Sequence, residues 1–198
     1  MSTAAVSAPP APSGAPARHR RTLPRPLAST LMAAVIGLGL FAAVTPTPLF
    51  PVYSADWALS PLTLTLVYAT YAVGVLAALL VAGSVSDDVG RRPVLLVSIA
   101  ALMASTVLFA VATSVAWLFV ARGVQGLATG VAISAASAAL LDLHPRRDPS
   151  AAGLANAVAS SAGIAFGILV AALLVGLGSA PLVLPYIALF GLLAVALI

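Results

Sequence analysis

Charged residues that could do chemistry occur at only a few places in this apolar chain. One group places four charges within six residues between two long apolar runs: Asp87, Asp88, Arg91 and Arg92. Another is Arg122, a single cation inside an apolar run. Opposite charges beside a bilayer can form ion pairs, and an arginine within a membrane helix needs a polar cavity or a partner. We therefore expect the first group to lie at the membrane surface and Arg122 to face a polar cavity or a partner.

Residue types that serve catalysis or metal binding are scarce. The chain contains no cysteine, which excludes a disulfide framework and a thiolate metal site. We find no H-E-x-x-H, no G-x-S-x-G, no phosphate loop and no acid pair within an apolar run. We therefore expect no metal, no cofactor and no enzymatic activity. No acid or histidine lies inside an expected span, so proton coupling would require a carboxylate from a partner half.

The composition indicates a membrane protein. Of 198 residues, 62% are hydrophobic and 7% are charged, whereas soluble domains carry about 25% charged residues. An apolar soluble helical domain is the alternative, but no amphipathic period runs through these segments. The net charge of +4 would suggest nucleic acid in a soluble protein. Here the arginines flank apolar runs, so we expect a lipid bilayer as partner and no nucleic acid.

Six apolar segments predict an all-α integral membrane fold. Each approaches the roughly 17–25 residues of a spanning helix. The expected spans are 27–44, 64–82, 94–113, 116–141, 151–176 and 182–198. Residues 1–26 carry six prolines and are expected to form a disordered tail. The alternative, a secretory signal peptide ending after residue 44, lacks a clear cleavage site. We thus expect one six-helix domain over residues 27–198.

The arginines predict the orientation in the membrane. Alternating crossings place the N-terminal tail and the connections 83–93 and 142–150 on one side, together with eight of the nine arginines. The basic side of a membrane protein is usually cytoplasmic. Both termini are therefore expected in the cytoplasm. The Ala-rich composition, with Arg and Asp as the only charged residue types, indicates a bacterial source and hence the inner membrane.

Residues 83–95 resemble the pattern G-x-L-a-D-r-x-G-r-r-x-x-l, which lies between the second and third helices of the major facilitator superfamily. The matching positions are Gly83, Asp87, Gly90, Arg91, Arg92 and Leu95. Asp88 departs from the pattern, because the family usually has a basic residue there. A second stretch, Leu118-x-x-x-Arg122-x-x-Gln125-Gly126-x-x-x-Gly130, resembles the fourth-helix pattern of the same family.

A third family pattern is incomplete in this chain. Drug/proton antiporters of the superfamily carry G-x-x-x-G-P-x-x-G-G on the fifth helix. Gly163 and Gly167 match its first part, but the proline and the glycine pair are missing. A small-residue face for helix packing is the preferred interpretation of these two glycines.

The resemblance implies the N-terminal half of the family fold, built of two inverted three-helix repeats. A second six-helix half or a homodimer would then be the partner. The implied gating residues are Gly83, Asp87, Gly90, Arg91, Arg92 and Asp142. Asp142 is expected to pair with Arg91 or Arg92. The alternative is that these charges only fix the topology.

The resemblance also implies a central substrate path. Arg122, Gln125 and Thr129 fall on one helix face by their spacing. Tyr68, Tyr71 and Asn156 are weaker candidates, because interhelical packing is the more frequent role of such side chains. For Arg122 the alternative is a helix-end arginine that extends toward the membrane surface.

The implied function is secondary transport of a small organic solute by alternating access, for which efflux is one direction. The alternative is a non-transporting truncated membrane protein or a membrane-embedded interaction partner.

Overall fold

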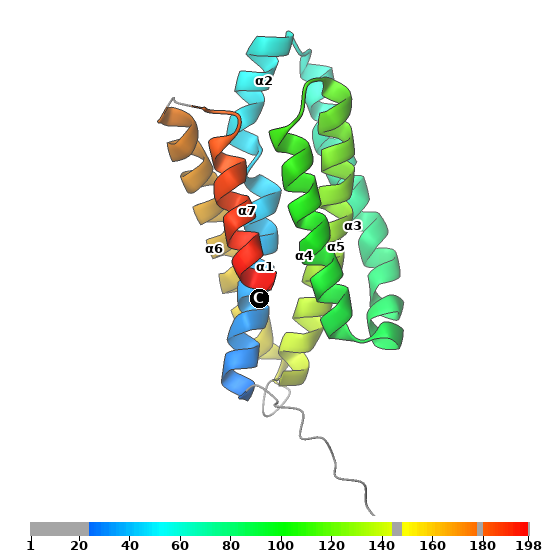
Figure 1. Cartoon of the computed structure of the whole chain (residues 1–198). Coiled ribbons are helices and arrows are strands. Elements are labelled where there is room, and N and C mark those ends of the chain that lie inside the picture. Colours follow the sequence, from blue (N-terminus) through cyan, green and yellow to red (C-terminus); the bar gives the residue numbers. More distant parts are fainter. Residues whose placement is uncertain (1–23, 144–147, 178–179, 198) are drawn as a thin grey trace, which may run out of the picture.

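In the computed structural model, residues 24–143, 148–177 and 180–197 are described, except for the side chains of residues 82–88. The described residues form helices joined by short turns, with no strand among them (Figure 1). Its elements are α1 (Arg25–Val44), the short 3-10 helix η1 (Thr47–Leu49), α2 (Phe50–Trp57), α3 (Pro61–Val89), α4 (Arg91–Ala110), α5 (Val115–Leu143), α6 (Pro149–Gly176) and α7 (Leu184–Leu197). The expected tail lies mostly in residues 1–23, outside the described residues, and α1 already begins at Arg25.

The prediction of an all-α membrane fold is confirmed, although several helix ends differ from the expected ones. Within the described residues, five helical segments are long and apolar enough to cross a membrane: Arg25–Trp57, Pro61–Val81, Arg91–Ala110, Val115–Leu143 and Pro149–Gly176. The sixth expected span, 182–198, corresponds to α7, a shorter apolar helix of 14 residues within the described chain. Residues 181–183 form turns, and α7 begins just before Pro185, where a proline fits a first helical turn.

The first expected loop is largely helical. Pro48 and Pro51 are the second residues of η1 and α2, where a missing N–H costs no hydrogen bond within that helix. The chain continues past these prolines as a series of helices. The last of them, α2, ends where Ala58 adopts a left-handed conformation with φ 48°. Residues 47–57 are therefore helical and extend the apolar segment that begins at Arg25, contrary to the expected loop.

The expected loop 83–93 is also helical on both sides. α3 continues to Val89, and α4 begins at Arg91. Gly90 alone makes the turn, with φ 93° and ψ 149°, a backbone conformation that side-chain-bearing residues rarely adopt. The prediction of a loop was wrong here because one glycine suffices for the reversal.

Two glycine seams hold the long helices together. In the first, between α3 and α5, a Cβ at Gly126 would strike the Tyr71 carbonyl. In the second, between α1 and α6, a Cβ at Gly163 would strike the Gly37 carbonyl, and one at Gly167 would lie 2.9 Å from Phe41 Cα. Glycine permits this close backbone approach of membrane helices. The packing interpretation of Gly163 and Gly167 is thus confirmed.

The helix pairing follows the order that two inverted three-helix repeats require. Counting α1, α3, α4, α5, α6 and α7 as first to sixth, the second packs on the fourth and the fifth packs on the first. Exchanging the first repeat (α1, α3 and α4) with the second (α5, α6 and α7) converts the α3–α5 pair into the α6–α1 pair. The third and sixth helices, α4 and α7, lie against each other (Figure 1).

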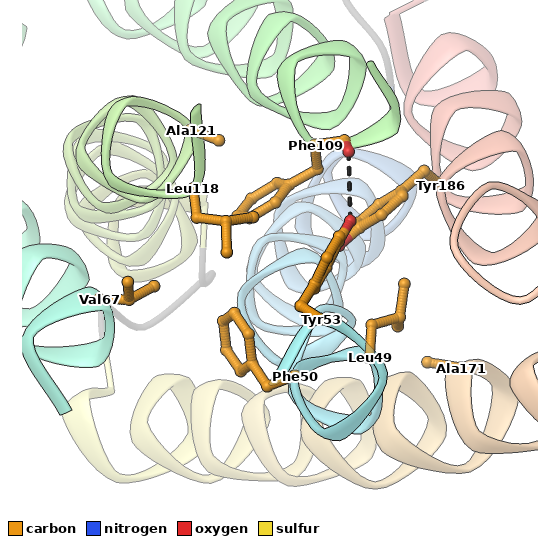
Figure 2. Packing of buried hydrophobic residues seen from close by; sticks show 9 residues of the cluster. All are labelled: Leu49, Phe50, Tyr53, Val67, Phe109, Leu118, Ala121, Ala171 and Tyr186. Carbon is orange, nitrogen blue, oxygen red and sulfur yellow. Dashed lines mark hydrogen bonds between the residues drawn. The ribbon is translucent and has the colours of Figure 1, made fainter. Parts of the chain in front are cut away.

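An aromatic cluster joins the elements at the α2 end of the bundle (Figure 2). Tyr53 of α2 donates a hydrogen bond to the Phe109 carbonyl of α4 at 3.3 Å. The Phe109 ring stacks on Tyr186 of α7, with 5.3 Å between ring centroids. This cluster fixes α2 and α7 against α4.

Candidate functional site

Arg122 lies inside the bundle and is only 1% exposed. Its Nη1 donates to the Ala43 carbonyl at 2.8 Å and to Gln125 Oε1 at 2.7 Å. Gln125 Nε2 in turn donates to the Ala42 carbonyl at 2.7 Å. Two side chains of α5 therefore bind the end of α1. The alternative of a side chain that extends to the membrane surface does not hold.

A proline after α1 explains why the Ala42 carbonyl lacks a helical donor. Pro46 follows Ala42 by four residues and has no N–H to complete the helical hydrogen bond. At the junction, the backbone bonds run from Thr45 N to the Phe41 carbonyl and from Leu49 N to the Pro46 carbonyl. The last carbonyls of a helix carry partial negative charge and attract cations. The carbonyl oxygens at the end of α1 can therefore bind a guanidinium.

Aromatic rings complete the surroundings of Arg122. The distances from Arg122 Cζ to the ring centroids are 5.0 Å for Phe50, 5.4 Å for Tyr71, 5.5 Å for Tyr68 and 5.7 Å for Phe109. Such distances permit cation–π attraction. None of the described carboxylates forms an ion pair with Arg122. Neutral groups alone therefore surround this cation within the described part of the chain.

The other predicted path residues separate into two sets. Gln125 and Thr129 are fully buried on the Arg122 face of α5, and Tyr68 and Tyr71 of α3 meet Arg122 through their rings. Asn156 lies elsewhere. Its Oδ1 accepts a 3.4 Å hydrogen bond from Ser137. Ser137 lies about 22 Å from Arg122 along α5, at 1.5 Å per residue.

Sequence reasoning missed several members of this cluster. Phe50 and Phe109 contribute rings, and Ala42 and Ala43 contribute carbonyl oxygens. The rings carry no distinguishing sequence signal. The Ala42 carbonyl does, because Pro46, four residues later, leaves it without its usual donor.

The predicted gating residues lie at the opposite end of the bundle from α2. Arg91 Nη2 and Asp142 Oδ2 form an ion pair at 2.8 Å, with the side chains 29% and 53% exposed. Of the two pairings considered from the sequence, the structure therefore contains Arg91–Asp142, while Arg92 is exposed. Gly83 and Asp87 lie in the helical segment whose side chains are outside the described residues.

Comparison with known families adds to this geometry. The sequence pattern of the Major Facilitator Superfamily matches residues 30–198. The chain belongs to the Major Facilitator Superfamily. The superfamily match includes every described helix from the second turn of α1 onward. The family that the two motifs predicted is thereby confirmed, and with it a multi-pass membrane protein.

Individual superfamily relatives match a shorter segment. Multidrug resistance protein MdtL from Escherichia coli O45:K1 (strain S88 / ExPEC) is 33% identical over 109 residues. The same values hold for MdtL from Escherichia coli O81 (strain ED1a) and O127:H6 (strain E2348/69 / EPEC). The matched segment covers 54% of this chain but only 28% of these relatives.

Proposed function

We propose that this chain is half of a secondary transporter that moves a small organic solute across the bacterial inner membrane by alternating access. The observation that carries the proposal is Arg122, a buried intramembrane cation bound to the end of α1. Ionisable residues inside membrane helices are costly and generally mark substrate or ion pathways. The name of the MdtL relatives supports efflux of organic compounds as the direction.

A complete path requires a second six-helix half, because family members place their substrate sites between two such halves. We propose that another polypeptide segment or a second copy of this chain provides it. The basic connections face the cytoplasm, as do both termini. The work of this protein is transport without chemical conversion, and it uses no cofactor and no nucleic acid.

The Arg91–Asp142 pair is proposed to act as part of the gate at the cytoplasmic end, with Gly83, Asp87, Gly90 and Arg92. Both pairing side chains are partly exposed, and such an ion pair contributes only about 0–1 kcal/mol to stability. Its energetic weight is too small to hold the bundle together. The role of the ion pair would be to hold the start of α4 beside the end of α5.

The test is transport by proteoliposomes that contain the chain, alone and together with a co-expressed second half. The solutes are ethidium, a cation, and fluorescein, an anion, and saturable uptake of either supports the proposal. No transport by either preparation would favour the non-transporting interaction protein.

Asp142→Asn tests the gate in the same proteoliposomes. We expect the transport rate to fall at least about fivefold, with a melting temperature close to that of the unchanged protein because the pair is weak. Asp148→Asn is the matched control. It removes the same charge at the same end, and asparagine caps a helix as well as aspartate does. Equal rates for all three proteins would show that the charges only fix topology.

A further inference from the structure

A pocket of about 540 Å³ opens beside the Arg122 cluster, between the η1–α2 segment and α3. Phe50 and Tyr68 line it. The same two rings face the Arg122 guanidinium, at 5.0 and 5.5 Å. They meet edge to face, with 4.8 Å between their centroids. The pocket and the buried cation therefore share two aromatic walls.

The cation behind these walls has unused binding capacity. Arginine remains charged in proteins and has five N–H donors. Arg122 Nη1 is bonded, but Nε is buried and has no acceptor among the described residues. No described carboxylate pairs with Arg122. Because interactions between charges strengthen where water is excluded, this region should attract an anion and repel a second cation.

The remaining pocket walls indicate what kind of anion fits. Leu64 and Pro51 are apolar, and the two aromatic rings offer stacking surfaces, while Thr47 and Ser54 provide hydroxyl groups. Ligand sites of this size are mainly apolar, with a few polar groups that fix orientation. A flat aromatic body with one carboxylate matches such walls and the guanidinium.

We propose that this pocket takes an aromatic monocarboxylate. The ring system of the ligand lies between α2 and α3, and its carboxylate reaches the free N–H donors of Arg122 when Phe50 and Tyr68 move apart. The inference rests on the proposed transport function and names the substrate class of that transporter.

The test uses three naphthalene compounds that share one shape and differ in charge at pH 7. Binding of tritiated 2-naphthoate to the full chain in nanodiscs is measured by scintillation proximity, with empty nanodiscs as the partition background. Unlabelled 2-naphthoate, 2-naphthylmethanol and 2-naphthylmethylamine then compete. We expect the alcohol and the amine to need at least about tenfold higher concentrations than the carboxylate. Equal potency, or a stronger amine, would overturn the proposal.

Variants test whether the preference for the carboxylate compound depends on the Arg122 guanidinium. Arg122→Gln should remove the advantage of the carboxylate, whereas Arg122→Lys should retain most of it. If Arg122→Gln does not fold, Phe50→Leu replaces it. This variant keeps the cation and loses a ring, so binding of all three compounds should weaken by a similar factor. Ser29→Ala, near the other end of α1, is the matched control and should bind 2-naphthoate normally.

The outcomes separate the two proposals. A chain that transports solutes but prefers the amine contradicts the anion site and leaves transport standing. A chain that binds 2-naphthoate selectively but never transports, even with a second half, contradicts the transport function and leaves the anion site standing. Retention of the carboxylate preference in folded Arg122→Gln would overturn the assignment to Arg122.

Discussion

At the residue scale, Arg122 and Gln125 join α5 to α1 by donating hydrogen bonds to the Ala43 and Ala42 carbonyls near the end of α1. Pro46 removes the donor that would otherwise bond the Ala42 carbonyl, and Gln125 supplies a replacement at 2.7 Å. Gln125 also accepts a hydrogen bond from Arg122. The amide thus supplies a donor to a buried carbonyl and an acceptor to one N–H group of the buried cation, and its loss should affect both.

Gln125→Leu should destabilise the protein by about 1.5–3 kcal/mol, because it removes a hydrogen bond to a charged group and leaves the Ala42 carbonyl without a donor. Reversible unfolding by sodium dodecyl sulfate in mixed micelles measures the change. Ser137→Ala on the same helix is the control. Its bond to Asn156 is long, 3.4 Å, and should contribute less than about 1 kcal/mol. Equal losses in both variants would contradict the special role of Gln125.

At the element scale, the position of α6 depends on backbone contact with α1. A Cβ at Gly163 would collide with the Gly37 carbonyl, and backbone is less able to move aside than a flexible side chain. Gly153 lies on the same helix, but nothing lies within 4 Å of a Cβ placed there. The helix α6 therefore contains one glycine in close backbone contact with α1 and one glycine with open space around it.

Gly163→Ala should cost about 1–3 kcal/mol of stability through overpacking. Gly153→Ala should be neutral or stabilise by up to about 1 kcal/mol, because alanine restricts the unfolded chain at a position it can occupy without strain. The same unfolding titration compares them. A stabilising Gly163→Ala would show that α1 and α6 are not in close backbone contact.

At the scale of the whole molecule, charge distribution predicts how the bundle sits in the membrane. The chain has no cysteine, so a single introduced thiol reports one position. The turn between α2 and α3 and the start of α6 lie at opposite ends of the bundle (Figure 1). Ser60 belongs to that turn and Ser150 to the first turn of α6, and both are exposed. They are therefore suited to a test of orientation.

In intact cells, Ser60→Cys should react with a membrane-impermeant maleimide, and Ser150→Cys should react only after permeabilisation. This follows from the cytoplasmic preference of arginine-rich connections. The unchanged, cysteine-free protein is the labelling blank. The reverse pattern would invert the proposed topology, and labelling of both positions in intact cells would contradict a sealed crossing between them.

Local patterns in the sequence predicted most of the architecture. Runs of apolar residues located the spans, because transfer into lipid depends on the composition of about twenty neighbouring residues. Two motifs identified the family, which the match over residues 30–198 confirms. The errors occurred at helix ends. Prolines were interpreted as a loop although first-turn positions tolerate them, and the charges before Gly90 were interpreted as a loop although a helix can continue beyond an apolar run.

The sequence by itself therefore determined the fold class, the family and the face of α5 that carries Arg122, since these depend on composition and helical period. Only the tertiary structure decided what surrounds that residue. The Ala43 carbonyl is 79 positions away along the chain, and the rings come from α2, α3 and α4. Helix packing brings such distant groups together. The distance between the packed helices depends on glycines that contact the backbone of another helix, and such contacts cannot be deduced from one helix alone.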